Sequence, residues 1–307
     1  MMGVCMCKNR KEPLITVYTP TYNRAQCLVK LHESLCLQSC KDFEWYIIDD
    51  GSTDNTSELV KEWISSSSFV IRYFYKQNEG VHTARDFAYN LIDSELIVGV
   101  DSDDSLLPNA IEIISKKWLE CDDRSKLCGI VTYVQDNQGI FLGKKLPQND
   151  FVTYQDLIYK YQCRGDYTFI LRSNVIKKIP KAPIFEGEKL VSESYKWIQL
   201  PELPFLVFRS STIVHNYLES GYTLNVRKNW FRNLNGYSAL YNQHLKNNRF
   251  LKYRILFAVK YVIASLFLQK KQIVKESNAP FLTMLFFPFA WIVYYYMRLK
   301  YRNLYRD

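Results

Sequence analysis

The sequence predicts an α/β fold in which a mostly parallel sheet is flanked by helices, followed by a helical C-terminal region. Short apolar runs rich in β-branched and aromatic residues alternate with segments of helical length through the first hundred residues. Each apolar run ends in a polar loop rich in Pro, Gly, Asn or Asp. Strands that alternate with helices in this way form βαβ units, whose strands are parallel.

The expected elements follow one another in a regular order. The expected strands are residues 14–18, 45–48, 70–75 and 96–100. The expected helices lie at about 24–37 and 81–91, with one between them that follows residues 53–55 and carries Leu59, Val60, Trp63 and Ile64. Asn23 is expected to cap the first helix, because Asn is a favoured residue at that position. In open sheets of this kind, ligands bind beyond the carboxyl ends of the strands. The polar loops therefore predict a binding site at that edge.

The most distinctive loop follows the fourth strand and reads Asp101-Ser102-Asp103-Asp104. Carboxylates this close repel one another, so they need a cation or several hydrogen-bond donors. Mg²⁺ and Mn²⁺ prefer oxygen ligands and commonly take one or two carboxylates together with phosphate oxygens. Taken alone, an acidic turn after a strand is the simpler interpretation. The other loops at the same edge favour a metal, held by Asp101 and Asp103, that bridges two phosphates.

Other loops at this edge supply groups suited to a nucleotide. The Asp50 carboxylate can accept hydrogen bonds from a base or a ribose, and the backbone N–H groups that follow Thr21 can face an anion. Arg85 can pair with a phosphate, although an arginine on a helix surface is more often only solvated. Neither a P-loop nor a dinucleotide-binding glycine pattern is present, which argues against P-loop kinases and dinucleotide oxidoreductases.

Four segments, in order, resemble the signature of family 2 glycosyltransferases of the GT-A fold, over about residues 12–120. They are Thr19-Pro20-Thr21-Tyr22-Asn23-Arg24, Ile47-Ile48-Asp49-Asp50-Gly51-Ser52-Thr53-Asp54, Asn78-Glu79-Gly80 and Asp101-Ser102-Asp103-Asp104. The resemblance implies a nucleotide-diphosphate sugar donor, usually linked to UDP, a divalent cation (Mn²⁺ or Mg²⁺) and inverting single displacement.

The resemblance also implies roles for individual residues. Asp50 would contact the uracil, and Asp101 with Asp103 would lie at the metal and the donor ribose. The remaining residues expected around the donor nucleotide are Thr19, Pro20, Tyr22, Arg24, Asn78, Gly80, Arg85 and Ser102.

A second resemblance concerns the catalytic base. An inverting transfer needs a carboxylate that takes the proton from the acceptor hydroxyl. Residues 185–193, Phe-Glu-Gly-Glu-Lys-Leu-Val-Ser-Glu, resemble the E-G-E-K-F-x-x-E segment of capsular and exopolysaccharide glycosyltransferases. This resemblance implies that Glu193 is the base, with Glu188 as the alternative. Ser194 follows Glu193 where the wider family has Asp, and a solvated acidic loop is the competing interpretation.

Three further residues are weaker candidates. Asp166 lies in a segment similar to one in these polysaccharide enzymes and is expected to contact the donor or acceptor sugar. His215 is expected to contact the metal or the diphosphate, with a structural hydrogen bond as the alternative. Trp197 can stack on a sugar ring or pack in the core.

Composition divides the chain into a short tail at 1–11, a GT-A domain at 12–224 and a C-terminal region at 225–307. The domain is expected to hold the nucleotide-sugar in its 12–120 half and the acceptor in its 121–224 half. From about residue 225 the acidic residues become rare, and residues 279–297 carry no charge. Nineteen such residues could just span a bilayer core of about 30 Å. An interfacial helix and a buried core helix are the alternatives.

Together, these observations predict a glycosyltransferase on the cytoplasmic face of a bacterial membrane, peripheral or anchored by its C-terminal region. It would move a sugar from a UDP-sugar to a lipid-linked or oligosaccharide acceptor in surface polysaccharide synthesis. The net charge of +9 favours the inner membrane surface, and no nucleic-acid motif is present. The eight Cys are expected to be reduced, since neither a zinc spacing nor a signal peptide is evident.

Two alternatives to this function remain. One is a non-catalytic relative that binds a nucleotide or acts as a scaffold. The other is a nucleotidyltransferase, which would release pyrophosphate. The sequence leaves the sugar, the acceptor and the oligomeric state open.

Overall fold

The structure is a computed structural model that describes residues 13–216 and 226–303, and its contacts divide the chain into two units. The first unit comprises residues up to Ile179 together with 200–218, and the second comprises 180–199 together with the residues from Glu219 onward. The boundary expected between residues 224 and 225 lies outside the described residues. Residues 180–199 pack with the C-terminal helices because their polar groups are hydrogen-bonded there, as described below.

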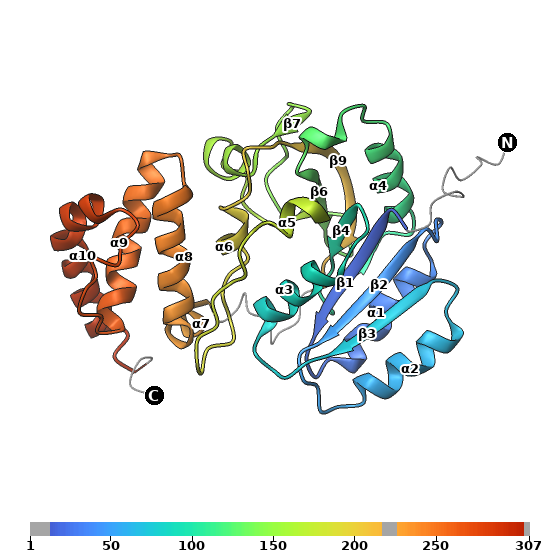
Figure 1. Cartoon of the computed structure of the whole chain (residues 1–307), viewed down its shortest axis with the longest axis horizontal. Helices are drawn as coiled ribbons and strands as arrows, with labels where there is room; N and C mark the ends of the chain where they lie inside the picture. Colours follow the sequence, from blue (N-terminus) through green and yellow to red (C-terminus); the bar gives the residue numbers. More distant parts are fainter. Residues whose placement is uncertain (1–12, 217–225, 304–307) are drawn as a thin grey trace. The chain divides into compact units, whose positions relative to one another are not determined.

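A nine-stranded sheet organises the first unit (Figure 1). Its strands are β1 Ile15–Thr21, β2 Phe43–Asp49, β3 Val70–Tyr75, β4 Leu96–Gly99, β5 Ser105–Leu106, β6 Gly129–Gln135, β7 Phe151–Val152, β8 Tyr167–Arg172 and β9 Phe205–Val214. The order is β3-β2-β1-β4-β8-β6-β9-β5, with β7 paired to β9. Strands β3, β2, β1 and β4 are parallel, whereas β8 is antiparallel to both β4 and β6. The predicted α/β class is confirmed, with a mixed sheet.

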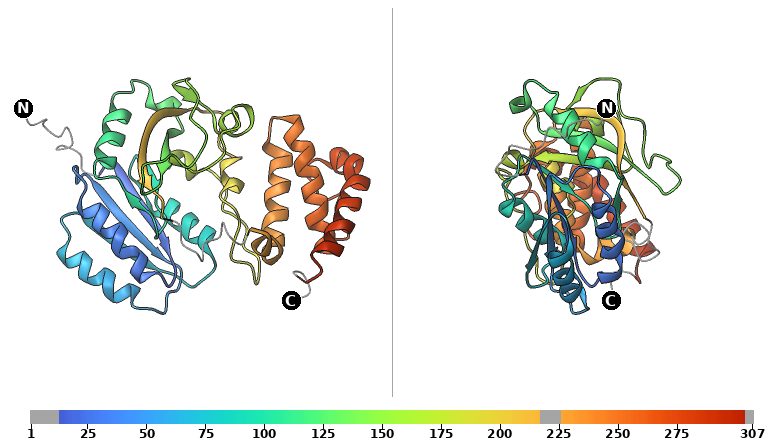
Figure 2. Two further views of the ribbon diagram at one scale, coloured as in Figure 1. Left: turned by 180° about the vertical axis from the view of Figure 1, so that it is seen from behind. Right: turned by 90° about the vertical axis from the view of Figure 1, so that its right-hand side faces the viewer.

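Helices cover both faces of this sheet (Figure 2). They are α1 Ala25–Cys36, α2 Thr56–Ser66, α3 Val81–Leu91, α4 Ala110–Leu119 and the short α5 Ser173–Ile176, with a 3₁₀ turn at Arg124–Lys126 and a π turn at Asp156–Lys160. Helices α1, α2 and α4 contribute to the same buried cluster as Val17. Tyr89 of α3 instead contacts Tyr18, at 2.8 Å between the hydroxyl oxygens. Successive strand residues face opposite sides, so α3 covers the other face.

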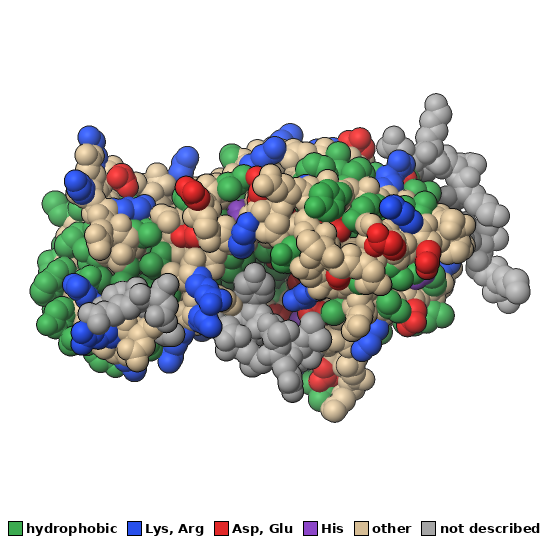
Figure 3. Space-filling model, turned by 90° about the horizontal axis from the view of Figure 1, so that it is seen from below, with side chains coloured by type: hydrophobic (Ala, Val, Ile, Leu, Met, Phe, Trp, Pro, Cys, Tyr) green, Lys and Arg blue, Asp and Glu red, His purple; other side chains and the backbone are tan. Residues whose placement is uncertain are grey.

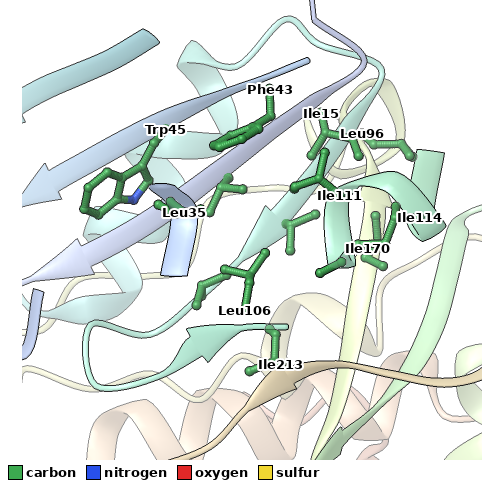
Figure 4. Packing of buried hydrophobic residues seen from close by; sticks show 14 of the residues in the cluster. Ile15, Leu35, Phe43, Trp45, Leu96, Leu106, Ile111, Ile114, Ile170 and Ile213 are labelled. Atoms are coloured by element: carbon green, nitrogen blue, oxygen red, sulfur yellow. The ribbon is translucent and has the colours of Figure 1, made fainter. Parts of the chain in front are cut away.

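The core of the first unit lies between the sheet and helices α1 and α4 (Figure 4). Ile15, Trp45 and Leu96 from three adjacent parallel strands pack with Leu35 of α1 and Ile111 of α4. All of these side chains are essentially inaccessible to solvent. This core fixes the ends of β1, β2 and β4, from which the polar loops extend.

The second unit is a helical bundle. Its helices are α6 Ser194–Trp197, α7 Val226–Arg232, α8 Leu234–Asn247, α9 Leu251–Phe267 and α10 Pro280–Lys300. Helix α9 packs against both α8 and α10, around the buried Tyr261, Val262 and Ala264. In the described part of the chain, α10 alone is long and apolar enough to cross a bilayer, judged by length and composition. Only 11% of its most apolar window is buried, so α10 is not a buried core helix.

Candidate functional site

The loops after β1, β2, β3 and β4 are joined to one another at the carboxyl edge of the sheet, where the sequence placed the site. The parallel register brings Thr21 beside Asp49 and Asp49 beside Tyr75, so these strands end at the same level. Hydrogen bonds and ion pairs then connect the four loops. Each connection involves side chains that the sequence motifs contain.

The first two loops are held together by Asn23 and Asp54. The Asn23 side-chain oxygen accepts a hydrogen bond from the Thr53 N–H at 2.7 Å, so Asn23 does not cap α1 as expected. Asp54 takes that place: its carboxylate accepts from the Ala25 N–H of α1 at 3.1 Å and from the Thr56 N–H of α2 at 3.2 Å. Burial works against ionisation, yet the hydrogen bonds from Thr56 and Ala25 keep the Asp54 pKa below its usual value.

Asp50 connects the second loop to the third from inside the protein. Its carboxylate accepts hydrogen bonds from Lys76 Nζ at 2.7 Å, from the Glu79 N–H at 3.1 Å and from the Gly80 N–H at 2.7 Å. Gly80 has a φ of 104°, a conformation that favours glycine, and this directs its N–H toward Asp50. Asp50 is 3% exposed. The Asp50 carboxylate thus already accepts hydrogen bonds from the loop after β3. A contact with uracil would use its remaining lone pairs.

Two arginines pair with the carboxylates expected at the metal. Arg24 Nη1 lies 3.1 Å from Asp103 Oδ2, and Arg85 Nη2 lies 3.0 Å from Asp101 Oδ1. Arg24 also lies 3.4 Å from the hydroxyl of the buried Ser102. The Asp101 side chain is 52% exposed, whereas that of Asp103 is 14% exposed. The guanidinium groups thus balance the negative charge that the acidic loop brings together.

A third carboxylate of this loop, Asp104, has a role that the sequence analysis did not assign. Asp104 is buried and accepts a hydrogen bond from His215 Nδ1 at 2.7 Å. Burial raises the Asp104 pKa, while the hydrogen bond to His215 opposes that rise. The same hydrogen bond raises the His215 pKa, with smaller contributions from Asp166 and Asp103. His215 therefore connects the end of β9 to the acidic loop.

Asn216 adds two more contacts to this connection. Its N–H donates to Asp104 Oδ1 at 3.3 Å, and its side-chain amide donates to the Asp103 carbonyl at 2.9 Å. Three acidic residues within the four positions 101–104 and a His just after an apolar run were visible in the sequence. Their pairing was not, because more than a hundred residues separate them.

Oxygen ligands for a divalent cation are present in the acidic loop. Within residues 13–216 and 226–303, no group of three or more His, Cys, Asp or Glu side chains is arranged to hold a metal. A Mg²⁺ ion bound mainly through substrate phosphates needs only one or two carboxylates. Asp101 and Asp103 fit that donor set, provided that the arginines release them.

The remaining expected donor contacts lie around these loops. Thr19 and Pro20 are buried, and the Thr19 hydroxyl accepts a hydrogen bond from Trp45 Nε1 at 3.0 Å, so both shape the loop from within. Tyr22 is 48% exposed, and Asn78 is half-buried.

Glu188 and Glu193 lie in the second unit. The Glu188 carboxylate accepts hydrogen bonds from the Asn235 N–H at 2.7 Å and the Gly236 N–H at 2.8 Å, which are orphan donors in the first turn of α8. Glu193 immediately precedes α6, and its side chain is partly exposed. Trp197, at the end of α6, is also partly buried.

Comparison with known proteins gives matches to glycosyltransferases. Residues 16–179 match the family model described as "Glycosyl transferase family 2". An uncharacterized glycosyltransferase of Rickettsia felis is 41% identical over 144 residues, which is 44% of this chain and only 23% of that protein. The "GalNAc(5)-diNAcBac-PP-undecaprenol beta-1,3-glucosyltransferase" of Campylobacter jejuni is 25% identical over 232 residues, 74% of this chain and 73% of that protein.

A solved structure shares the fold. The crystal structure of S. aureus TarS 1–349 in complex with UDP-GlcNAc superposes with a TM-score of 0.58 at 16% identity, covering 95% of this chain and 89% of that one.

Proposed function

The chain belongs to glycosyl transferase family 2, and on that premise we propose that it transfers a sugar from a UDP-linked donor to a lipid-linked or saccharide acceptor. The transfer would invert the anomeric centre in one displacement and would serve bacterial surface polysaccharide assembly at the cytoplasmic face of the membrane. The name of the Campylobacter jejuni relative supports a lipid-linked acceptor, and the ligand in the TarS structure supports a UDP-sugar.

The observation that carries this proposal is the acidic loop with its two arginine partners. A nucleoside diphosphate is an anion, and the loop offers it two guanidinium groups beside two carboxylates. When bound by Asp101 and Asp103, a divalent cation would supply positive charge to the leaving diphosphate. Arg24 and Arg85 would exchange their carboxylate partners for phosphate oxygens, since a guanidinium pairs well with either group.

The residues on the acceptor side have distinct proposed roles. Glu193 accepts the proton of the incoming hydroxyl, whereas Glu188 supports the segment that carries Glu193 by capping α8. His215 holds the end of β9 against the acidic loop through Asp104. Asp166 and Trp197 are proposed to contact the sugars.

A panel of nucleotide-sugars with Mn²⁺ tests the proposal in the intact protein. The correct donor should raise the unfolding temperature, because a ligand that binds only the native state stabilises it. Transfer should release UDP, and Asp103→Asn should lower the rate by about 10²–10³-fold, the usual cost of losing a group that stabilises developing charge. The matched control is Asp123→Asn, which alters an exposed carboxylate paired with Lys126.

Three results would contradict the proposal. Release of pyrophosphate would indicate a nucleotidyltransferase. Donor binding without any transfer to a range of acceptors would indicate a non-catalytic relative. Unchanged turnover of Asp103→Asn in the presence of EDTA would remove the metal role of the acidic loop.

A further inference from the structure

Helix α10 presents a continuous apolar stripe to its surroundings. Phe281, Leu285, Phe289, Ile292, Tyr296 and Leu299, called the apolar face below, follow one another at intervals of three or four residues. Their exposed fractions lie between 57% and 69%. Figure 3 shows hydrophobic side chains gathered over α10, with Lys and Arg side chains beside them. Six large exposed apolar side chains in one continuous stripe indicate a surface that binds a partner.

The opposite side of α10 is occupied along most of its length. Thr283 and Ala290 are fully buried, and Leu282, Val293 and Met297 pack on the cluster formed by α8 and α9. Neighbouring helix α9 carries Lys252, Arg254 and Lys260. Charged residues are costly inside a bilayer, so α9 cannot accompany α10 across one. A spanning α10 would have to leave the bundle that it completes.

Pro288 gives a second reason why α10 should lie in a partly hydrated region. It lies inside the helix and has no N–H to donate to the carbonyl of Met284. Both residues are on the exposed side, where no neighbouring helix of the bundle covers them. Within hydrocarbon this carbonyl would lack a partner, whereas water at a lipid headgroup layer can supply one. The exposed Trp291 and Tyr295 also suit the headgroup layer.

Charge identifies the partner of this surface. Residues 226–303 contain 14 Lys and Arg but a single acidic residue, Glu276, whereas the rest of the chain contains 26 Lys and Arg against 30 acidic residues. The chain's positive net charge therefore arises wholly from this part.

Some of these basic residues gather at one end of the apolar face. The Arg227 guanidinium of α7 lies 5.3 Å from the ring of Tyr301, which follows α10, and Lys300 lies 5.3 Å from the ring of Tyr296. The Arg227–Tyr301 contact places the start of α7 beside the end of α10. The exposed basic residues of these two segments are called the basic end: Arg227, Lys228, Arg232, Arg298, Lys300 and Arg302.

We propose that α10 lies in the plane of an anionic lipid surface, with its apolar face in one leaflet and the basic end on the lipid phosphates. The helix thus docks without crossing the bilayer, as amphipathic interfacial helices do. This inference rests on the membrane location included in the proposed function. Vesicle binding nevertheless tests it without any sugar donor, so its failure can be told from a failure of sugar transfer.

Trp291 provides a test of depth, because it lies near the middle of α10 and is half-exposed. The full-length protein is mixed with vesicles whose lipids carry bromine either near the headgroup or deep in the acyl chain. An in-plane helix predicts stronger quenching by the shallow bromine, and Trp291→Phe should remove that difference. Stronger quenching by the deep bromine would show a spanning helix and overturn the proposal.

Two variants test the contacts. Ile292→Gln should weaken vesicle binding about tenfold or more, the effect of exposing one buried aliphatic side chain. Ile140→Gln, at a similarly exposed position in the first unit, should leave vesicle binding unchanged. Lys300→Gln should weaken binding about fivefold on anionic vesicles and not on neutral ones. Absence of vesicle binding, with a dimer in sedimentation that Ile292→Gln dissociates, would show that a second copy covers the apolar face and would overturn the proposal.

Discussion

Glu188 and Glu193 lie five residues apart, yet their side chains have different surroundings. Glu188 is 9% exposed, and its two oxygens accept hydrogen bonds from the backbone and side chain of Asn235 and from the backbone of Gly236. Glu193 is partly exposed at the start of α6. A general base must reach the proton that it removes. The surroundings therefore favour Glu193 as the base and give Glu188 a supporting part.

Exchange of each glutamate for glutamine should separate the two roles. Glu193→Gln should lower turnover about 10²–10⁴-fold, the usual contribution of a general base, and should leave UDP binding and the unfolding temperature nearly unchanged. Glu188→Gln should instead lower the free energy of unfolding by about 1–3 kcal/mol, because a charged acceptor of buried donors is lost. Steady-state kinetics, UDP titration and urea unfolding measure these effects, with Glu186→Gln as the exposed control. A Glu193→Gln protein that lost only donor affinity would place the base elsewhere.

His244 makes the stability of the bundle depend on pH. Its ring is buried, stacks on Phe257 at 3.8 Å between centroids and lies 3.3 Å from the Ser194 hydroxyl. Burial, with a smaller contribution from Lys260, lowers the His244 pKa to about 3. The unfolded chain therefore binds a proton below pH 6.5 that the folded chain does not bind, and acid favours unfolding.

The expected loss follows from that difference in proton binding. The contribution of His244 to the free energy of unfolding is fully present above pH 6.5. The free energy of unfolding should fall by about 2 kcal/mol between pH 6.5 and 5, since one pKa unit corresponds to about 1.4 kcal/mol. Urea unfolding of the wild type and of His244→Gln at several pH values isolates this contribution from those of the other histidines. Parallel pH profiles for the two proteins would show that His244 carries no such linkage.

At the level of single residues, the sequence motifs predicted which loops lie together at the carboxyl edge of the sheet. They did not predict which side chains form hydrogen bonds or ion pairs there. Asp101, Asp103 and Arg24 were expected at one site, and the structure brings them together. The pairing of Asp104 with His215 was not expected, because no local pattern connects residues so far apart in the chain. Asn23 was expected to cap α1 because of its position, but Asp54, in the loop after β2, supplies the cap.

Asp54 shows how two helices depend on one side chain. Its carboxylate accepts from the first turn of α1 and from the N–H and hydroxyl of Thr56 in α2. Asp54→Ala should lower the free energy of unfolding by about 1–2 kcal/mol, in the range of a lost N-cap. Asp54→Asn should retain only part of that stability, because Ala25 and Thr56 donate to different carboxylate oxygens and an amide keeps only one of them. Asp122→Ala serves as the exposed control. Thermal or urea unfolding measures the three variants, and equal effects of Asp54→Ala and Asp122→Ala would contradict the shared cap.

Elements set by local periodicity were predicted well, and elements set by distant pairing were not. β3 and α3 have the expected bounds, because apolar spacing within each segment determines the buried face. β8 has no such local signal for its direction: its antiparallel position between β4 and β6 depends on partners some seventy and forty residues earlier in the chain. The contacts of residues 180–199 with the C-terminal helices likewise depend on partners far along the chain, such as Asn233 and Asn235.

For the molecule as a whole, the residues proposed for donor binding and the proposed base belong to different units. The donor loops belong to the first unit, which has its own core, whereas Glu193 lies on a segment whose polar groups are satisfied by the second. The Asn233 side chain accepts from the N–H groups of Lys189 and Leu190, and Glu188 caps α8. Removal of the C-terminal helices would remove these hydrogen-bond partners.

A chain truncated after Leu224 should therefore bind UDP with nearly the affinity of the full protein and yet transfer no sugar. The donor loops keep every partner described above, while residues 188–193 lose the hydrogen bonds that hold them on α8. UDP titration and a transfer assay to a water-soluble acceptor, which removes any need for membrane docking, measure the two properties. The matched full-length control is Ile292→Gln, which alters the apolar face but keeps the bundle, and it should transfer normally in the same assay. Transfer by the truncated chain at a rate similar to that of the full protein would show that the base does not depend on the C-terminal helices.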